Sequence, residues 1–126
     1  IGAGSCNSNL KNNYDSVKIW SYKQKKFYDT GEQFLGLYFG DHSKCAINTS
    51  FNTGTIVGVN CNIFGSGFPR NYIPSFSWGG RSGLMEYSID KAISTAKIVM
   101  KRRGIEISDE YIKMMKNVFN MTSNFR

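Results

Sequence analysis

The only histidine of the chain is the side chain best suited to proton transfer near neutral pH. His42 lies in the stretch GDHSK, between Asp41 and Lys44. An imidazole has an unperturbed pKa of about 6.5, so it can accept or donate a proton near neutral pH. Three roles stay open for His42: a general base, a contact to a phosphate or a ribose, or a solvated turn residue.

Lysines and amide side chains near the start of the chain could bind an anion. Ammonium groups attract phosphates, and asparagine and tyrosine side chains form hydrogen bonds to sugars. The Asn-rich loop SCNSNLKNNYDS should bring such side chains beside Lys44, which we expect at a turn. The candidate residues for binding a substrate or cofactor are Lys11, Asn13, Tyr14, Lys18, His42, Lys44 and Asn48.

The cysteines do not form a pattern that binds metal. There are three cysteines, Cys6, Cys45 and Cys61, with no Cys-x-x-Cys motif and one histidine in the whole chain. We therefore expect no zinc site. We expect Cys45 and Cys61, and also Cys6, to be buried reduced thiols, which favours a reducing, cytoplasmic compartment.

Apolar residues recur at every sixth position in the middle of the chain, and a small residue follows each of them after four positions. The apolar positions are Phe39, Cys45, Phe51, Val57 and Ile63. The small positions are Ser43, Thr49, Thr55, Cys61 and Gly67. Neither the helical period nor strict strand alternation fits this stretch, so it is a repeat of six residues.

This repeat predicts a mainly β fold, a left-handed parallel β-helix of about three coils followed by two C-terminal α-helices. Each hexad would supply one short strand and one turn, and the coils would stack at about 4.8 Å. The alternative is an ordinary antiparallel sheet, against which stands the lack of two-residue hairpin signals inside the run.

The predicted organisation is one structural domain in two parts. Residues 1–80 should form the β-helix, with an inserted loop and the aromatic loop FGSGFPRNYIPSFSWGG at its end, and residues 81–126 a helical cap. The stretch YKQKKFYDT predicts two short strands around a basic turn. Because the chain opens at Ile1, inside a hexad, we expect it to be a fragment of a longer protein.

Two helices are predicted from their caps and apolar faces. Ser88 and Ser108 are candidate N-caps, and KRRG should end the first helix with cations and a glycine. The apolar faces are Ile89, Ile93, Ala96 and Met100 in the first helix and Ile112, Met115 and Phe119 in the second. Both helices should cover the open end of the β-helix, where strand edges would otherwise be unpaired.

The charge of the chain is concentrated outside the hexads. The net charge is +7, from 16 basic and 9 acidic residues, and the excess lies before residue 27 and after residue 68. No nucleic-acid-binding motif occurs, so we expect no nucleic-acid partner, and we expect no membrane span. A smaller polyanion such as a sugar phosphate, a nucleotide sugar or coenzyme A is the expected partner.

Several strings of the chain resemble known enzymes. The segment IGAG, the triplet Asn13, Tyr14 and Asp15, the lysine Lys18 and the hexads resemble the acetyltransferase half of bifunctional N-acetylglucosamine-1-phosphate uridyltransferases. The strings GDHSK, INTSFNTGT and GFPRNYIPSFSWGG resemble a group of sugar nucleotidyltransferases that join a nucleotidyltransferase domain to a β-helix.

This resemblance implies roles for some of the residues. In the acetyltransferase family the Asn-Tyr pair and the nearby lysine contact the amino-sugar phosphate and the acyl donor, which makes Asn13, Tyr14 and Lys18 candidates. The match needs an insertion of about four residues near NLKN. The family's general-base histidine lies upstream of IGAG, so His42 is not its counterpart.

Three classes of function follow. The first is an acyltransferase domain that uses acetyl-CoA or another acyl-CoA to modify an amino-sugar phosphate or a nucleotide sugar. The second is a trimerisation or regulatory domain of a sugar-1-phosphate nucleotidyltransferase, and the third is a standalone polyanion-binding module. The resemblance also implies a homotrimer and an upstream nucleotidyltransferase domain in the full-length protein.

Overall fold

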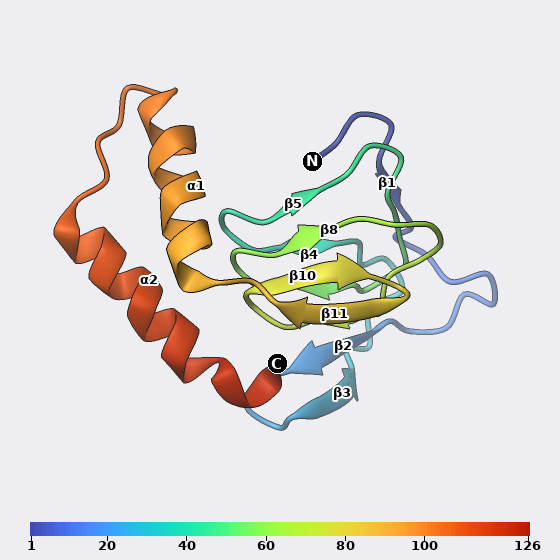
Figure 1. The fold of residues 1–126 in the computed structure, drawn as a ribbon. Coiled ribbons are helices and arrows are strands. Elements are labelled where there is room, and N and C mark those ends of the chain that lie inside the picture. Colours follow the sequence, from blue (N-terminus) through green and yellow to red (C-terminus); the bar gives the residue numbers. More distant parts are fainter.

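The computed structural model describes residues 1–126, which form a body of short strands with two helices beside it (Figure 1). The strands are β1 (Cys6–Asn7), β2 (Lys18–Ser21), β3 (Lys26–Asp29), β4 (Tyr38–Phe39), β5 (Lys44–Cys45), β6 (Ser50–Phe51), β7 (Ile56–Val57), β8 (Asn62–Ile63), β9 (Tyr72–Ile73), β10 (Ser77–Gly80) and β11 (Gly83–Glu86). The helices are α1 (Ile89–Lys101), α2 (Asp109–Met121) and the short 3-10 helix η1 (Ser123–Phe125).

The strands form four small sheets. One has the order β4-β7-β9 and another the order β11-β10-β8-β5, while β1 pairs with β6 and β2 pairs with β3. The pairs within β4-β7-β9 and within β5-β8-β10 are parallel. The pairs β10-β11 and β2-β3 are antiparallel. The body is therefore a set of mixed sheets of two to four strands.

The predicted regular left-handed β-helix of about three coils is wrong, because the strands do not form a regularly coiled solenoid. Parallel partners are 18 residues apart at Phe39 and Val57, but 16 apart at Val57 and Ile73. The first strand pairs Cys6 with Ser50 across a separation of 44 residues. The loop and the hairpin between β1 and β4 break the repeat on one side, and β11 folds back antiparallel on the other.

The six-residue spacing nevertheless identifies residues of the first core cluster. Phe51, Val57 and Ile63 are buried at two-residue strands, and Phe39 and Cys45 pack against them. In so short a strand only one side chain can point inward, so the apolar period follows the length of strand plus turn. Cys61 and Ile73 complete the buried cluster.

A second core cluster joins the strands to the helices. Phe76 has no exposed surface and packs with Ala92, Ile93 and Ala96 of α1 and with Met115 of α2. Its N–H donates to the carbonyl of Val59 (2.8 Å), and its own carbonyl accepts from the N–H of Tyr87 (2.7 Å). The helices therefore lie alongside the strands (Figure 1), whereas the sequence predicts that they cover one end of a β-helix.

The two helices have the predicted positions. The Ser108 hydroxyl caps α2 by accepting from the N–H of Tyr111, as predicted, whereas the Ser88 side chain makes no capping hydrogen bond in α1. Gly104, whose φ of 72° lies in the left-handed region, follows the basic end of α1. No helix of the chain has both the length and the apolar character that crossing a bilayer requires.

The stretch YKQKKFYDT supplies the basic turn and strand β3 of the antiparallel hairpin β2-β3, whereas the other strand, β2, lies before the stretch. Lys18 lies opposite Asp29, and Trp20 opposite Phe27. The buried side chain of Val17 anchors the base of the hairpin, and its backbone bonds continue the ladder to Glu32 (2.8 Å). The Trp20 ring stacks on Tyr72 of β9 with centroids 4.4 Å apart. The hairpin is thus docked against the body by aromatic packing.

Replacing Phe76 tests the junction between strands and helices. Phe76→Ala should lower the free energy of unfolding by about 3–5 kcal/mol, because it empties the centre of the second core cluster. Chemical denaturation followed by circular dichroism measures this loss. Phe68→Ala is the control, since Phe68 is 47% exposed. A loss below about 1 kcal/mol for Phe76→Ala would show that the helices are held by other contacts.

The three thiols differ in solvent exposure, whereas the sequence predicts that all three are buried. Cys61 is fully buried, Cys45 is half-buried and Cys6 is exposed. The expectation for Cys6 is wrong because β1 lies at the edge of its sheet and both of its residues are exposed. Burial also raises the pKa of the Cys61 thiol, which disfavours the reactive thiolate.

Thiol labelling should follow this order. A maleimide added to the folded protein should modify Cys6 rapidly and Cys61 only after unfolding, with Cys45 in between, and mass spectrometry of peptides gives the rate at each site. A double variant, Cys6→Ser with Cys45→Ser, isolates Cys61. Rapid modification of this variant in the folded state would contradict the packing of the first core cluster.

Candidate functional site

A groove with three cations along it is the strongest candidate for a binding site. It has a volume of about 770 Å³. Its lining residues are Lys11, Lys18, Phe27, Thr53, Arg70, Asn71 and Tyr72. The three cations come from the loop after β1, the hairpin and the segment before β9. No carboxylate is among the lining residues, so the groove is suited to an anion.

A smaller polar hollow of about 370 Å³ adjoins this groove and shares Lys11, Thr53 and Asn71 with it. Its other lining residues are Ser8, Leu10, Asn12, Asn13 and Asn52. Amide and hydroxyl groups can both donate and accept hydrogen bonds. The combined site therefore offers charge at one part and neutral hydrogen-bonding groups at another.

The Asn-rich loop is held in place by its own side chains. The Lys11 ammonium donates to the carbonyl of Ser16 (2.6 Å), and the Asp15 N–H donates to the Asn13 side-chain oxygen (3.2 Å). The Asn13 amide also donates to the Asp15 carboxylate. Tyr14 follows Asn13 with a φ of 60°, in the left-handed region, and is 64% exposed. This turn places Lys11 and Asn13 at the site but leaves Tyr14 outside the lining of both hollows.

Lys18 is placed by the hairpin, directly across from Asp29. A hydrogen bond from Ser16, one from the Gly31 N–H, and the charges of Lys18 and Lys11 hold the pKa of the exposed Asp29 carboxyl below its usual value. Asp29 is therefore ionised at neutral pH and lies within electrostatic reach of both lysines. Its carboxylate does not line the groove itself.

Arg70 is a site residue that no pattern in the sequence predicts. It lies in the string GFPRNY, which carried the resemblance but had no assigned function. Arg70 is exposed, and the only ion pair in the chain joins Arg126 to Glu86. A cation next to a proline in an aromatic loop was a weak signal, because only the tertiary structure brings Arg70 beside Lys11 and Lys18.

Two buried polar atoms without hydrogen-bond partners lie near this groove. They are the Trp20 indole nitrogen and the Tyr72 hydroxyl, which belong to the stacked pair. Burial raises the pKa of Tyr72, so its hydroxyl stays protonated and can donate. Buried polar groups of this kind are usually satisfied by a protein group, a water or a ligand.

The structure separates His42, Lys44 and Asn48 from Lys11 and Lys18. Lys44 lines another hollow, together with Phe64 and Trp78, and its ammonium donates to the carbonyl of His42 (2.8 Å). Asn48 has a φ of 57° in the left-handed region and its N–H donates to Ala3. Asn48 thus serves a turn, and the predicted association of Lys44 with Lys11 and Lys18 is not observed.

His42 joins the strand body to the second helix. One of its ring nitrogens, Nε2, shares a hydrogen bond of 2.9 Å with the Tyr111 hydroxyl of α2. Its backbone has a φ of 58°, which marks a tight turn. Burial, followed by the nearby Lys44 charge, lowers the pKa of His42, while Asp41 has the opposite effect. The neutral imidazole is therefore favoured in the folded protein.

Comparison with known proteins does not assign the chain to a family. No protein-family model matches it, and a search of curated proteins gave no significant match.

The position of His42 predicts a pH dependence. The pKa of His42 is below 6.5 in the folded protein, so protonation of the imidazole favours the unfolded state. The contribution of His42 to the free energy of unfolding should therefore be complete above about pH 6.5. It should decrease as the pH falls toward the pKa of the folded state. An NMR titration can follow the single imidazole directly. Lys44→Met should raise its pKa by removing a like charge, and His42→Asn, which tolerates the left-handed backbone, should remove this pH dependence. A measured pKa above 6.5 would contradict this environment.

Proposed function

We propose that the chain binds a sugar phosphate in the groove lined by Lys11, Lys18 and Arg70, as part of a protein of sugar-nucleotide biosynthesis. The observation that carries the proposal is the convergence of three cations without a lining carboxylate. An ammonium supplies a point charge, whereas a guanidinium can bind two phosphate oxygens at once. Together they match a phosphate better than a singly charged carboxylate.

The other walls of the groove suit the sugar. Asn71 and Thr53 lie where the groove meets the polar hollow, in which Asn13 and Asn52 add further amides. These groups can form hydrogen bonds to sugar hydroxyls or to an amino substituent. Tyr72 lines the groove as well and offers an aromatic face on which a sugar ring can pack.

Binding is better supported than acyl transfer within this chain. Acyl transfer to an amine needs a general base at the reacting nitrogen. His42, the one histidine, is hydrogen-bonded to the Tyr111 hydroxyl and is not among the residues that line the groove. An acyltransferase domain requires an acyl-CoA donor, whereas a non-catalytic trimerisation or regulatory domain does not, so a titration with the donor distinguishes these two hypotheses.

Isothermal titration calorimetry with glucosamine 1-phosphate tests the proposal. Lys18→Ala and Arg70→Ala should each weaken binding by about tenfold or more, because a charge-assisted hydrogen bond contributes roughly 1.5–3 kcal/mol. Lys97→Ala is the matched control, since Lys97 is an exposed lysine of α1. Unphosphorylated glucosamine should bind much more weakly than the phosphate.

The outcomes distinguish the alternatives. If Lys97→Ala lowers the affinity for glucosamine 1-phosphate as much as Lys18→Ala does, the effect is one of net charge and not of a site. If the parent protein does not bind glucosamine 1-phosphate, the proposal is refuted and a role in assembly is left. A parallel titration with acetyl-CoA examines the acyltransferase hypothesis: binding that depends on Lys18 would support it.

A further inference from the structure

Strand β11 has a free backbone edge. It lies at the end of its sheet, and its only strand partner is β10. The Tyr87 N–H donates to the carbonyl of Phe76, and the Phe64 N–H donates to that of Gly79. In an antiparallel pair the hydrogen-bonded positions alternate, so Met85 and Gly83 face β10. The N–H and C=O groups of Leu84 and Glu86 therefore point away from the sheet.

A hollow of about 610 Å³ runs beside this edge. Its lining residues are Arg70, Tyr72, Pro74, Ser77, Gly83, Leu84, Met85, Glu86, Ser123, Phe125 and Arg126. All four residues of β11 are in the lining, and η1 with the residue after it forms part of the opposite wall. At about 3.4 Å per residue, the four-residue edge is about 14 Å long, the length of a short extended peptide.

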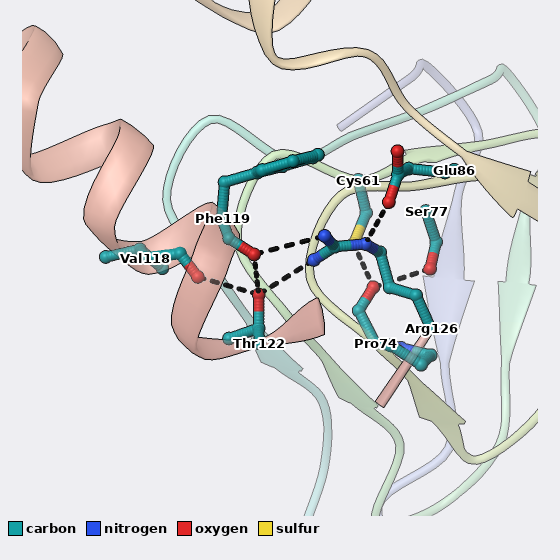
Figure 2. A network of polar contacts seen from close by, with 8 residues as sticks. All are labelled: Cys61, Pro74, Ser77, Glu86, Val118, Phe119, Thr122 and Arg126. Carbon is teal, nitrogen blue, oxygen red and sulfur yellow. Dashed lines mark hydrogen bonds and ion pairs between the residues drawn. The ribbon is translucent and has the colours of Figure 1, made fainter. Parts of the chain in front are cut away.

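Of the two arginines that line the hollow, one is in an ion pair and the other is not. The Arg126 guanidinium is held by the Glu86 carboxylate (2.9 Å), the Thr122 hydroxyl (2.9 Å) and the Phe119 carbonyl (3.1 Å), as Figure 2 shows. Glu86 is thereby neutralised. Arg70 has no ion-pair partner. The hollow therefore presents one free positive charge beside apolar walls, which include Leu84 and Phe125.

The far wall limits what can pair with β11. Exposed edges are commonly blocked by a lysine, a proline, a bulge or a covering segment, and the sequence GLME contains neither lysine nor proline. The segment η1 and the edge of β11 line the same hollow of about 610 Å³, which is of the size of a short extended chain. A second copy would bring together two chains of charge +7.

We propose that β11 is a docking strand for an extended, acidic segment of a partner protein. The segment adds to the sheet through the backbone groups of Leu84 and Glu86, as in β-strand addition. An acidic side chain of the segment pairs with Arg70, and an apolar side chain lies against Leu84 and Phe125. This docking site is distinct from the sugar-phosphate groove, but the two share Arg70.

A phage-displayed library of random seven-residue segments provides the probe. Selection on the protein should enrich segments with an aspartate or glutamate among alternating apolar residues. Leu84→Pro should abolish binding of an enriched synthetic peptide, because proline removes an outward N–H while the bonds of Met85 and Gly83 to β10 remain. Leu84→Val is the matched control and should bind the peptide as the parent protein does.

Further variants locate the site. Arg70→Ala should lower the affinity for the peptide by about tenfold. Lys18→Ala, which alters only the sugar-phosphate groove, should leave that affinity unchanged. Amide hydrogen exchange on the parent protein gives an independent readout, even if Leu84→Pro fails to fold. The peptide should slow exchange at Leu84 and Glu86, and exchange at Met85 should change little.

Three results would overturn the proposal. They are a selection that enriches no segment, an enriched peptide that leaves Leu84 and Glu86 unprotected, and self-association of the protein through this edge. Sedimentation of the parent protein and of Leu84→Pro detects the last of these. Loss of sugar-phosphate binding alone would leave the docking strand intact.

Discussion

The packing of Phe76 between the strand body and the two helices is the contact on which the arrangement of the chain depends. Its side chain is fully buried against both helices. Its backbone forms hydrogen bonds to Val59 through its N–H and to Tyr87 through its carbonyl. Phe76 has a φ of 58°, so the chain turns sharply at a residue that must also fill a core. The strained turn is held by the apolar surface that Phe76 buries.

The candidate site depends on the loop and hairpin inserted between β1 and β4. This insertion interrupts the repeat, and it also carries Lys11 and Lys18 to a segment that contains Arg70. The stacking of Trp20 on Tyr72 docks the hairpin against β9. Without that contact, the groove would lose one of its walls, so aromatic packing and anion binding are linked.

Unpaired cations connect the two proposed functions. A chain of net charge +7 contains one ion pair, between Arg126 and Glu86, and this pair lies at the C-terminal wall of the β11 hollow. Arg70 lies where the groove and that hollow meet, with Tyr72 beside it. An anion in the groove and an acidic segment at β11 would both draw on Arg70, so their binding should be mutually weakened.

The amino-acid sequence by itself determined the local features of this protein. Capping and apolar periodicity located both helices, and the six-residue spacing identified Phe51, Val57 and Ile63 as core residues, because these signals depend on neighbours along the chain. The tertiary structure alone decided the sheets, the separation of Lys44 from Lys18, the recruitment of Arg70 and the exposure of Cys6. Each of these depends on which distant strands pair, and the pairing changed where the insertion and the antiparallel return of β11 ended the repeat.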